Sequence, residues 1–220
     1  MKIAAFIPIK TTSKRVPGKN FRLLNEVPLY KYIISNTVNA GCFDEIYVDT
    51  DSDEIQEYAN KLNLNIINRK KELAEDDANG NDLLVYHASI TEDVDYFFQL
   101  FATAPLLSSK TINGCVNQLI NGENDSCFTV TEETGWFWFQ DYPVNYRPDV
   151  LPRSQDAKKV LKESTGLYGI SKEALLKYSC RIGAHPIMIK IDSIEALDID
   201  TEHEFSIVEK FIQDKESLIL

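Results

Sequence analysis

The chain has 220 residues, of which 44% are hydrophobic and 26% are charged, and its formal net charge is −11. This composition is that of an ordinary globular protein with one large core, so a disordered or fibrous chain is excluded. The acidic balance argues against nucleic acid as a partner.

The apolar runs and the cysteines indicate the cellular compartment of the protein. The apolar runs are only strand-sized, so we expect no membrane span. The N-terminus lacks the basic region and long apolar stretch of a signal peptide, and we expect a cytoplasmic protein. The four cysteines are far apart without C-x-x-C spacing, which disfavours zinc and indicates reduced, mostly buried thiols. We expect the three scattered histidines to be structural.

Strands and helices alternate along the first half of the chain. Residues 3–9 form a continuous apolar run that is typical of a buried strand. Helical spacing follows over residues 28–40, with Gly41 as the expected C-cap. We expect strands at 46–48 and 63–67, and between them a helix opened by Asp51 and Glu54 as a variant capping box.

The same alternation continues toward the C-terminus. Helices are expected over residues 81–92, 108–121, 171–178 and 201–214, and strands over 95–101, 126–131, 168–170 and 187–191. Thr201 and Glu204 have the spacing of a capping box for the last helix. The pattern predicts an α/β fold, a mainly parallel sheet with helices on both faces, in which ligands bind beyond the carboxyl ends of the strands.

Residues 132–163 interrupt this rhythm. The stretch "ETGWFWFQDYPVNYRPDVLPRSQ" is rich in aromatic residues and proline, and it keeps neither a helical nor a strand period for long. We therefore expect a single domain over residues 1–220 with 132–163 as an inserted segment.

A block of positive charge follows the first strand. The segment "KTTSKRVPGKN", residues 10–20, holds Lys10, Lys14, Arg15 and Lys19 within an acidic chain. Cations and backbone N–H groups at this position of such a fold suit a polyphosphate. The spacing matches neither a P-loop nor a dinucleotide-binding fingerprint, and a solvated surface loop is the alternative.

An acidic pair lies near the other end of the chain. Asp198 and Asp200 alternate with Leu197 and Ile199, so in an extended segment both carboxylates point to the same side. Mg²⁺ is the natural partner of such a pair, because it prefers oxygen ligands and phosphate-bearing substrates. The alternative is that one aspartate caps the next helix while the other is solvated. Together with the basic loop, the pair predicts a site for phosphoryl or nucleotidyl transfer.

Several segments resemble the cytidylyltransferases that activate acidic sugars, the CMP-sialate and CMP-KDO synthetases. "SKRVPGKN" (13–20) resembles the signature loop of that family. Further similar segments follow in the same order: "VDTDSDEI" (48–55), "RKKELAEDDA" (69–78), "ATAPLLS" (102–108), "TGLYGI" (165–170) and "DIDTEHEF" (198–205). The last of these is closest to the acylneuraminate branch.

The resemblance implies a Rossmann-like nucleotidyltransferase that joins CTP to a nonulosonic acid, such as N-acetylneuraminate, legionaminate or pseudaminate, and releases pyrophosphate. It implies Lys19, Asp198 and Asp200 as catalytic residues, with Mg²⁺ on the two aspartates. It also implies that the nucleotide is bound by Lys10, Ser13, Lys14, Asn20, Arg69, Gly80 and Thr103. Of these, Arg69 would contact a phosphate.

The resemblance also implies an acceptor pocket and a homodimer. Arg153 would pair with the sugar carboxylate, Tyr168 would line the sugar pocket and Thr165 would contact the acceptor. The insertion 132–163 resembles the segment through which family members dimerise. Its aromatic residues fit a buried partner surface, unless they fold back over their own subunit: Trp136, Phe137, Trp138 and Phe139.

The chain departs from the family pattern at four places. Lys10 replaces an arginine, Phe101 and Ala102 replace a glutamine-proline pair, Thr165 replaces an asparagine, and Leu107 replaces an arginine. We expect these positions to lie near the nucleotide or the acceptor. They leave open a different base, a KDO-like, phosphonate or phosphate-monoester acceptor, or a nucleotide-binding homologue without turnover.

Overall fold

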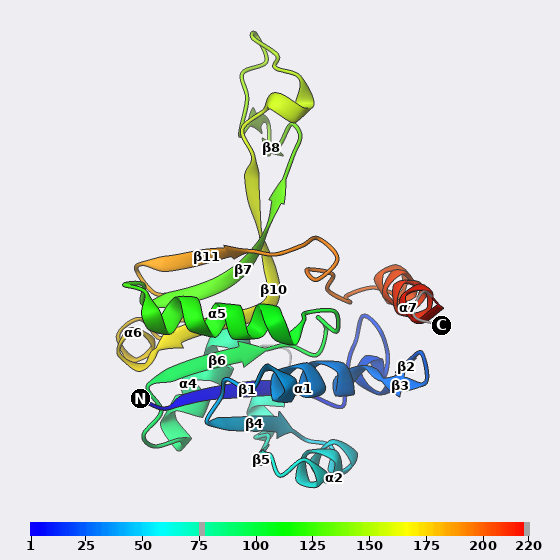
Figure 1. Cartoon of the computed structure of the whole chain (residues 1–220), viewed down its shortest axis with the longest axis vertical. Helices are drawn as coiled ribbons and strands as arrows, with labels where there is room; N and C mark the ends of the chain where they lie inside the picture. Colours follow the sequence, from blue (N-terminus) through cyan, green and yellow to red (C-terminus); the bar gives the residue numbers. More distant parts are fainter. Residues whose placement is uncertain (75–77, 218–220) are drawn as a thin grey trace.

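A mixed sheet of seven strands forms the centre of the protein, in the order β11-β7-β10-β6-β1-β4-β5 (Figure 1). The computed structural model of the chain describes residues 1–74 and 78–217, with side chains to residue 214. Within these residues β10 runs antiparallel to both neighbours, and the other sheet pairings are parallel. The predicted α/β class with a mainly parallel sheet is confirmed.

The sheet strands and the helices have the following bounds. The strands are β1 Ile3–Ile9, β4 Glu45–Thr50, β5 Asn65–Asn68, β6 Tyr96–Leu100, β7 Ser126–Glu133, β10 Val160–Ser171 and β11 Pro186–Lys190. The helices are α1 Leu29–Ala40, α2 Asp53–Lys61, α3 Lys71–Ala74, α4 Gly80–Ile90, α5 Ser109–Asn121, α6 Lys172–Tyr178 and α7 Glu202–Ser217, with 3-10 turns η1 Lys19–Phe21 and η2 Ser154–Asp156. Two small hairpins pair β2 Leu23–Leu24 with β3 Val27–Pro28, and β8 Trp138–Phe139 with β9 Tyr142–Pro143.

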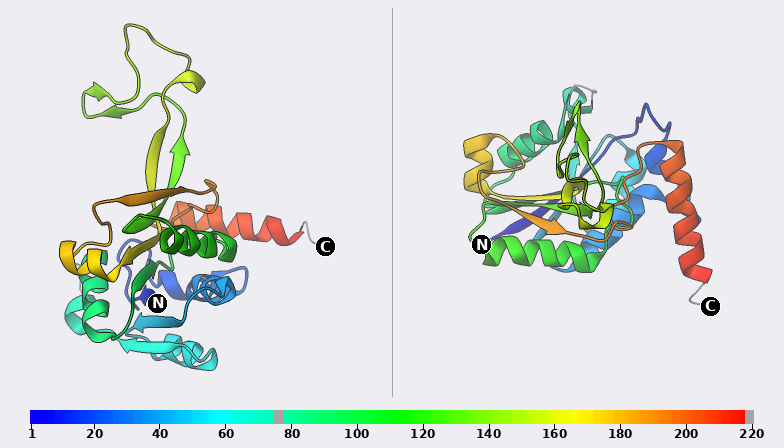
Figure 2. Two further views of the ribbon diagram at one scale, coloured as in Figure 1. Left: turned by 60° about the vertical axis from the view of Figure 1, so that its left-hand side comes forward. Right: turned by 90° about the horizontal axis from the view of Figure 1, so that it is seen from above.

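The central strand β1 shows why its sequence is apolar without interruption. Ala5 and Ile7 point into the core cluster shared with α1 and α5, whereas Ala4 and Phe6 point into the cluster shared with α4 and α6. Both faces of the sheet are therefore covered by helices. The view from above in Figure 2 shows helices on the two sides of the sheet. A strand buried on both faces needs apolar residues at consecutive positions.

The expected elements are present, with differences at their ends. Gly41 adopts the left-handed conformation of a C-cap (φ 61°), and Thr201 and Glu204 exchange the two hydrogen bonds of a capping box, both as predicted. The prediction for α2 was wrong in its cap. Ser52 accepts the hydrogen bond from the Ile55 N–H, because Asp51 turns toward the basic loop instead.

The segment that interrupts the alternation, residues 132–163, forms an arm that projects from the sheet (Figures 1 and 2). β7 extends to Glu133 and β10 starts at Val160, so the two long strands carry the arm over residues 134–159. The aromatic side chains of Trp136, Trp138 and Phe139 are 45%, 54% and 70% exposed. Phe137 is only half-buried, which differs from the prediction of four exposed rings. The alternative in which this segment covers its own subunit is wrong.

The cysteines are reduced, as expected, and two of them are fully buried. All four are free thiols; Cys115 and Cys127 are buried, whereas Cys42 and Cys180 are partly exposed. Burial raises the pKa of Cys42 to about 11 and that of Cys115 to about 12, so both stay protonated at neutral pH. In the described part of the chain, no helix combines the length and the apolar character needed to cross a membrane.

Candidate functional site

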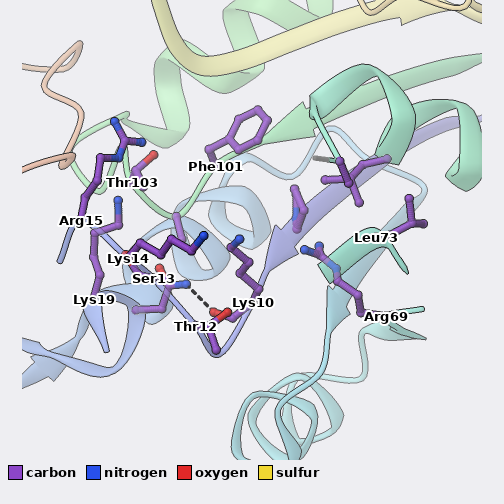
Figure 3. A pocket seen from close by; sticks show the side chains of 15 residues that line it. Lys10, Thr12, Ser13, Lys14, Arg15, Lys19, Arg69, Leu73, Phe101 and Thr103 are labelled. Carbon is purple, nitrogen blue, oxygen red and sulfur yellow. Dashed lines mark hydrogen bonds between the residues drawn. The ribbon is translucent and has the colours of Figure 1, made fainter. Parts of the chain in front are cut away.

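A cavity of about 400 Å³ opens beyond the carboxyl ends of β1, β5 and β6. Figure 3 shows Arg15, Lys19 and Thr103 on one side of it and Arg69 and Leu73 on the other. This is the edge at which a doubly wound sheet binds ligands. The cavity is lined by Pro8, Lys10, Thr12, Ser13, Lys14, Arg15, Lys19, Asn20, Arg69, Leu73, Ala78, Leu83, Phe101, Ala102 and Thr103.

The basic loop is fixed at several points. The backbone N–H and the hydroxyl of Thr11 donate to the two carboxylate oxygens of Asp51, each at 2.7 Å. Asn20 donates to the Lys10 carbonyl at 2.8 Å, and Val16 is fully buried beneath the loop. Gly18 takes φ 65°, a left-handed conformation that glycine adopts without strain. The loop is therefore a built part of the site, and a merely solvated surface loop is ruled out.

Lys19 is the buried cation of this loop. Its side chain is 8% exposed, donates to the Ile199 carbonyl and lies 3.5 Å from a carboxylate oxygen of Asp200. Burial lowers the pKa of Lys19, and Asp200 and Asp198 oppose that shift. The ammonium thus connects the N-terminal loop to the acidic segment, which lies 180 residues away in the sequence.

Arg15 makes the second connection. Its guanidinium donates to both carboxylate oxygens of Asp200, with N–O distances of 2.7 Å. The acidic segment is held in place by α7, whose Glu202 accepts from Arg22 and whose Phe205 ring lies 3.8 Å beneath that guanidinium. Ile199 is buried in the core between the two aspartates, as the alternating sequence predicted.

Asp198 has an oxygen that the protein does not satisfy. Oδ2 accepts from the Thr165 hydroxyl at 2.5 Å, but Oδ1 is buried and has no hydrogen-bond partner in the described part of the chain. An orphaned carboxylate oxygen suits a cation, so these residues fit the expected metal. Neither aspartate caps α7, since Thr201 and Glu204 do that.

The described residues do not supply a complete metal cage. They contain no group of three or more histidine, cysteine, aspartate or glutamate residues in metal-binding geometry. Mg²⁺ commonly takes one or two carboxylates and completes its shell with water and substrate phosphates. Asp198 and Asp200 would hold the ion on that pattern.

A second cavity of about 420 Å³ adjoins the acidic segment. Its wall combines the two aspartates with the start of β10 and the end of β7. Its residues are Thr131, Glu133, Lys162, Glu163, Ser164, Thr165, Ser193, Ala196, Leu197, Asp198, Asp200 and Glu204. The hydroxyls, the carboxylates and Lys162 make this a polar cavity, in contrast to the mixed lining of the first.

At the opposite side of the first cavity, Arg69 belongs to a buried polar cluster. Its Nε and Nη2 donate to the two carboxylate oxygens of Asp49, both at 2.9 Å, and His87 Nε2 lies 2.8 Å from Asp49 Oδ2. Burial alone would raise the pKa of Asp49, but the hydrogen bonds from His87 and Arg69 hold it below its ordinary value. The Asp49 carboxylate neutralises the charge of Arg69. Arg69 is therefore better suited to a hydrogen bond with an uncharged ligand atom than to the implied contact with a phosphate.

Most of the expected site residues come together around the two cavities. The first is lined by Lys10, Ser13, Lys14, Lys19, Asn20, Arg69 and Thr103, and the second by Thr165, Asp198 and Asp200. Residues 75–77, within the segment 69–78 that resembles the family, lie outside the described residues.

Three expectations need correction, those for Gly80, Leu107 and Tyr168. Gly80 does not line the first cavity; it lies at the start of α4 beside the Arg181 side chain, whose Nη1 would be 2.4 Å from an added Cβ. Leu107 is fully buried in the core and faces no ligand. Arg153 is 75% exposed on the arm, where it pairs with Asp156, and it lies in neither cavity of its own chain, so its contact with the acceptor stays a prediction.

Tyr168 is the third correction. Its side chain is fully buried, and its hydroxyl donates to Glu163. The Arg181 guanidinium covers the ring at 3.6 Å and lies 3.9 Å from Glu163. Tyr168 therefore supports Arg181 and lines neither of the two cavities.

Sequence reasoning assigned no functional role to Asp49 or Arg181, expected His87 to be structural, and left Arg15 without a partner. Arg15 stood within the basic loop, but only the folded chain brings it to Asp200. Asp49 could have been singled out as a carboxylate directly after the apolar residues 46–48 of the predicted strand. His87 and Arg181 had no signal beyond residue type.

The chain is similar in sequence to known cytidylyltransferases. A sequence model described as "Cytidylyltransferase" matches residues 4–219. N-acylneuraminate cytidylyltransferase A of Danio rerio is 26% identical over 94% of this chain, which spans only 50% of that protein. The pseudaminic acid cytidylyltransferase of Campylobacter jejuni is 28% identical, over 91% of this chain and 92% of the relative.

Solved structures agree with the fold. CMP:2-keto-3-deoxy-manno-octonic acid synthetase, solved in complex with CTP, superposes with a TM-score of 0.73 at 16% identity, over 98% of this chain and 100% of the other. The 4-diphosphocytidyl-2C-methyl-D-erythritol synthase of Anaerococcus prevotii gives 0.68 at 13% identity, over 96% and 99%. At these identities the likeness concerns the fold alone.

Proposed function

This chain belongs to the cytidylyltransferase family, and on that premise we propose that it couples CTP to an acidic keto-sugar to give the CMP-sugar and pyrophosphate. The acceptor class is a nonulosonic acid such as N-acetylneuraminate, legionaminate or pseudaminate. One observation supports this most strongly: Arg15 and Lys19 of the basic loop meet Asp200 of the acidic segment at the carboxyl edge of the sheet. The named activities of the relatives agree with it.

The first cavity suits a nucleoside triphosphate. Lys10, Lys14 and Lys19 gather at the basic loop, where they would neutralise phosphate oxygens. The other side of the cavity is apolar at Leu73 and Leu83, which suits the flat base. The ion pair of Arg69 with Asp49 carries no net charge but still offers an N–H donor, so we propose that Arg69 contacts the base or the ribose.

The reaction needs charge neutralisation more than covalent help. The anomeric hydroxyl oxygen of the acceptor forms a bond to the α-phosphorus of CTP while the bond to pyrophosphate breaks. Lys19 would stabilise the charge on the phosphates, and Asp198 and Asp200 would hold Mg²⁺. When bound there, Mg²⁺ would act as a Lewis acid on phosphate oxygens. Arg15 pairs with Asp200 and also lines the first cavity, where its guanidinium would contact a phosphate.

The acceptor would occupy the second cavity, beside Thr165 and the two aspartates. Arg153 of the same chain lies away from that cavity, on the arm. We propose a homodimer in which the exposed rings of Trp138 and Phe139 are buried by a second copy. In that arrangement Arg153 would serve the acceptor bound to the partner.

The compartment and the remaining classes of partner follow from the chemistry. The four thiols are free, as they would remain in the reducing cytoplasm. We therefore propose a cytoplasmic enzyme whose partners are CTP and a small acidic sugar, and neither nucleic acid nor membrane.

The test is a mass-spectrometric screen of CTP and Mg²⁺ with a panel of acidic keto-sugars. We expect a CMP-sugar and an equal amount of pyrophosphate with at least one nonulosonic acid. The double variant Asp198→Asn, Asp200→Asn should be folded and inactive. Full activity of that variant would refute the metal site, and absence of a product with every nonulosonic acid would refute the acceptor class.

A second candidate is a nucleotidyltransferase with another base or another acceptor, such as a KDO-like acid, a phosphonate or a phosphate monoester. Phe101 and Ala102 favour it, because they line the first cavity where the family carries glutamine and proline. Thermal-shift measurements with CTP, UTP, GTP and ATP separate the two. Stabilisation by CTP alone would exclude another base. A third candidate, a homologue without turnover, would bind CTP and form no product with any acceptor.

A further inference from the structure

Three charged or titratable side chains are buried together beneath the first cavity. The side chains of Arg69, Asp49 and His87 are 3%, 1% and 0% exposed. They come from the end of β5, from β4 and from α4 respectively. Burying such groups is costly unless each is satisfied by its neighbours, so an arrangement of this kind calls for an explanation.

The bonds within the trio fix the direction of each group. Asp49 Oδ1 accepts from Arg69 Nε, while Oδ2 accepts from Arg69 Nη2 at 2.9 Å and lies 2.8 Å from His87 Nε2. Because Arg69 keeps the carboxylate ionised, Asp49 can only accept, and His87 Nε2 must be the donor. The His87 ring is stacked on Phe6, with centroids 4.8 Å apart and planes 11° from parallel.

In the part of the chain that the structure describes, one polar atom of His87 is left unsatisfied, which costs free energy of folding. Its Nδ1 is buried and has no hydrogen-bond partner within the described residues. A histidine kept in the core with half of its polar groups unsatisfied does not serve packing alone, since an apolar ring would pack there without the penalty. What the histidine adds is the hydrogen bond to Asp49.

Arg69 is the member of the trio that lines the first cavity. Its Nε and Nη2 are used on Asp49, and Nη1 makes no bond within the described residues. The side chain lines the first cavity, opposite Lys19 and Arg15 (Figure 3). A guanidinium held by three bonds leaves one nitrogen for a ligand, at a fixed position.

We propose that Asp49 and His87 are positioning residues of the nucleotide site: they hold Arg69 so that Nη1 faces the nucleotide before it binds. The proposal rests on the proposed function for the identity of the ligand. A free arginine loses rotamer freedom when it binds, and a prefixed one does not, so Asp49 and His87 raise the affinity for the nucleotide without touching it. His87 acts through Asp49, and Asp49 acts through Arg69.

The first experiment examines Arg69 without any nucleotide. In the wild type we expect a sharp, slowly exchanging ¹⁵N signal from Arg69 Nε–H, because that proton is buried and bonded. His87→Phe keeps a ring on Phe6 but removes the donor, and it should broaden the signal or speed its exchange. His87→Gln keeps a donor and should restore it. An unchanged Arg69 signal in folded His87→Phe would overturn the proposal.

The second experiment measures the effect on the nucleotide, by titration calorimetry with CTP and by steady-state kinetics. We expect His87→Phe to raise the CTP dissociation constant and KM about tenfold, the worth of one hydrogen bond to a charged group, with kcat nearly unchanged. His87→Gln should stay within about threefold of wild type, because it still donates to Asp49. Asp49→Asn should lose at least as much affinity as His87→Phe.

Phe97→Leu is the matched control, since Phe97 also stacks on Phe6 but does not touch Asp49. It should lower the melting temperature, because it removes apolar packing from the same core cluster, and leave CTP affinity unchanged. If it raised the CTP dissociation constant as much as His87→Phe, the role of His87 would be structural and the proposal would fail. If the wild type did not bind CTP, the proposed function would fail, and the Arg69 signal would still decide whether the trio positions Arg69.

Discussion

Replacing Asp198 by asparagine separates stability from function at this site. Oδ1 of Asp198 is buried without a partner, a situation that costs about 1–3 kcal/mol for a polar group and more for a charged one. The asparagine side chain would be nearly isosteric, would keep an oxygen for the Thr165 hydroxyl and would carry no charge. Without metal, we therefore expect Asp198→Asn to be more stable than wild type by about 1 kcal/mol, or about 2–4 °C in melting temperature.

The same change should remove activity. If Asp198 holds the metal ion, its loss should lower kcat/KM by about 10²–10³-fold, the effect of deleting one preorganised electrostatic group. The assay is thermal denaturation in EDTA and in Mg²⁺ with CTP, together with pyrophosphate release. Wild type should gain stability from Mg²⁺ and CTP, and the variant should gain much less. A variant that is less stable in EDTA and turns over like wild type would refute the reasoning.

Further predictions concern the loop, the arm and the buried carboxylate. Lys19→Met should leave the Ile199 carbonyl without its donor and weaken CTP binding at least tenfold, as calorimetry would detect; equal affinity would exclude a phosphate contact. Gly18→Ala places a side chain at φ 65° and should cost about 1 kcal/mol in urea unfolding; no loss would show that the loop relaxes. The double variant Trp138→Ser, Phe139→Ser should run as a monomer in light scattering, against a dimer for wild type, and an unchanged mass would contradict an interface at the arm. The lowered pKa of Asp49 stabilises the fold fully above its unfolded pKa of about 3.9, and this contribution is lost as pH falls through the folded value. In Asp49→Asn the decline of stability below about pH 4 should therefore be shallower, by up to about 1.4 kcal/mol per pH unit, and a parallel decline would contradict the assignment.

The fold was predictable because its local signals agree with each other. The apolar run of β1, the glycine cap after α1 and the capping box of α7 each arise from neighbouring residues, and each is present. Ser52 was missed because two acidic residues with capping-box spacing flank it, and only the contact of Asp51 with Thr11 shows that Asp51 is engaged elsewhere.

The candidate site was predictable where its residues stand in short motifs. The basic loop and the acidic segment each had a charge pattern, and their meeting followed from the topology of such folds. The Arg69–Asp49–His87 trio was not predictable, because it depends on three segments packing together. The burial of Tyr168 under Arg181 and the reach of the arm away from its own cavities likewise depend on long-range packing.

A structure of the protein with CTP and Mn²⁺ in place of Mg²⁺ tests the central claim most directly. We predict an anomalous peak between Asp198 and Asp200, the triphosphate against Lys19 and Arg15, and the base beside Arg69. A nucleotide bound elsewhere, or a metal peak remote from both aspartates, would contradict the idea that the two ends of the chain build one nucleotide site.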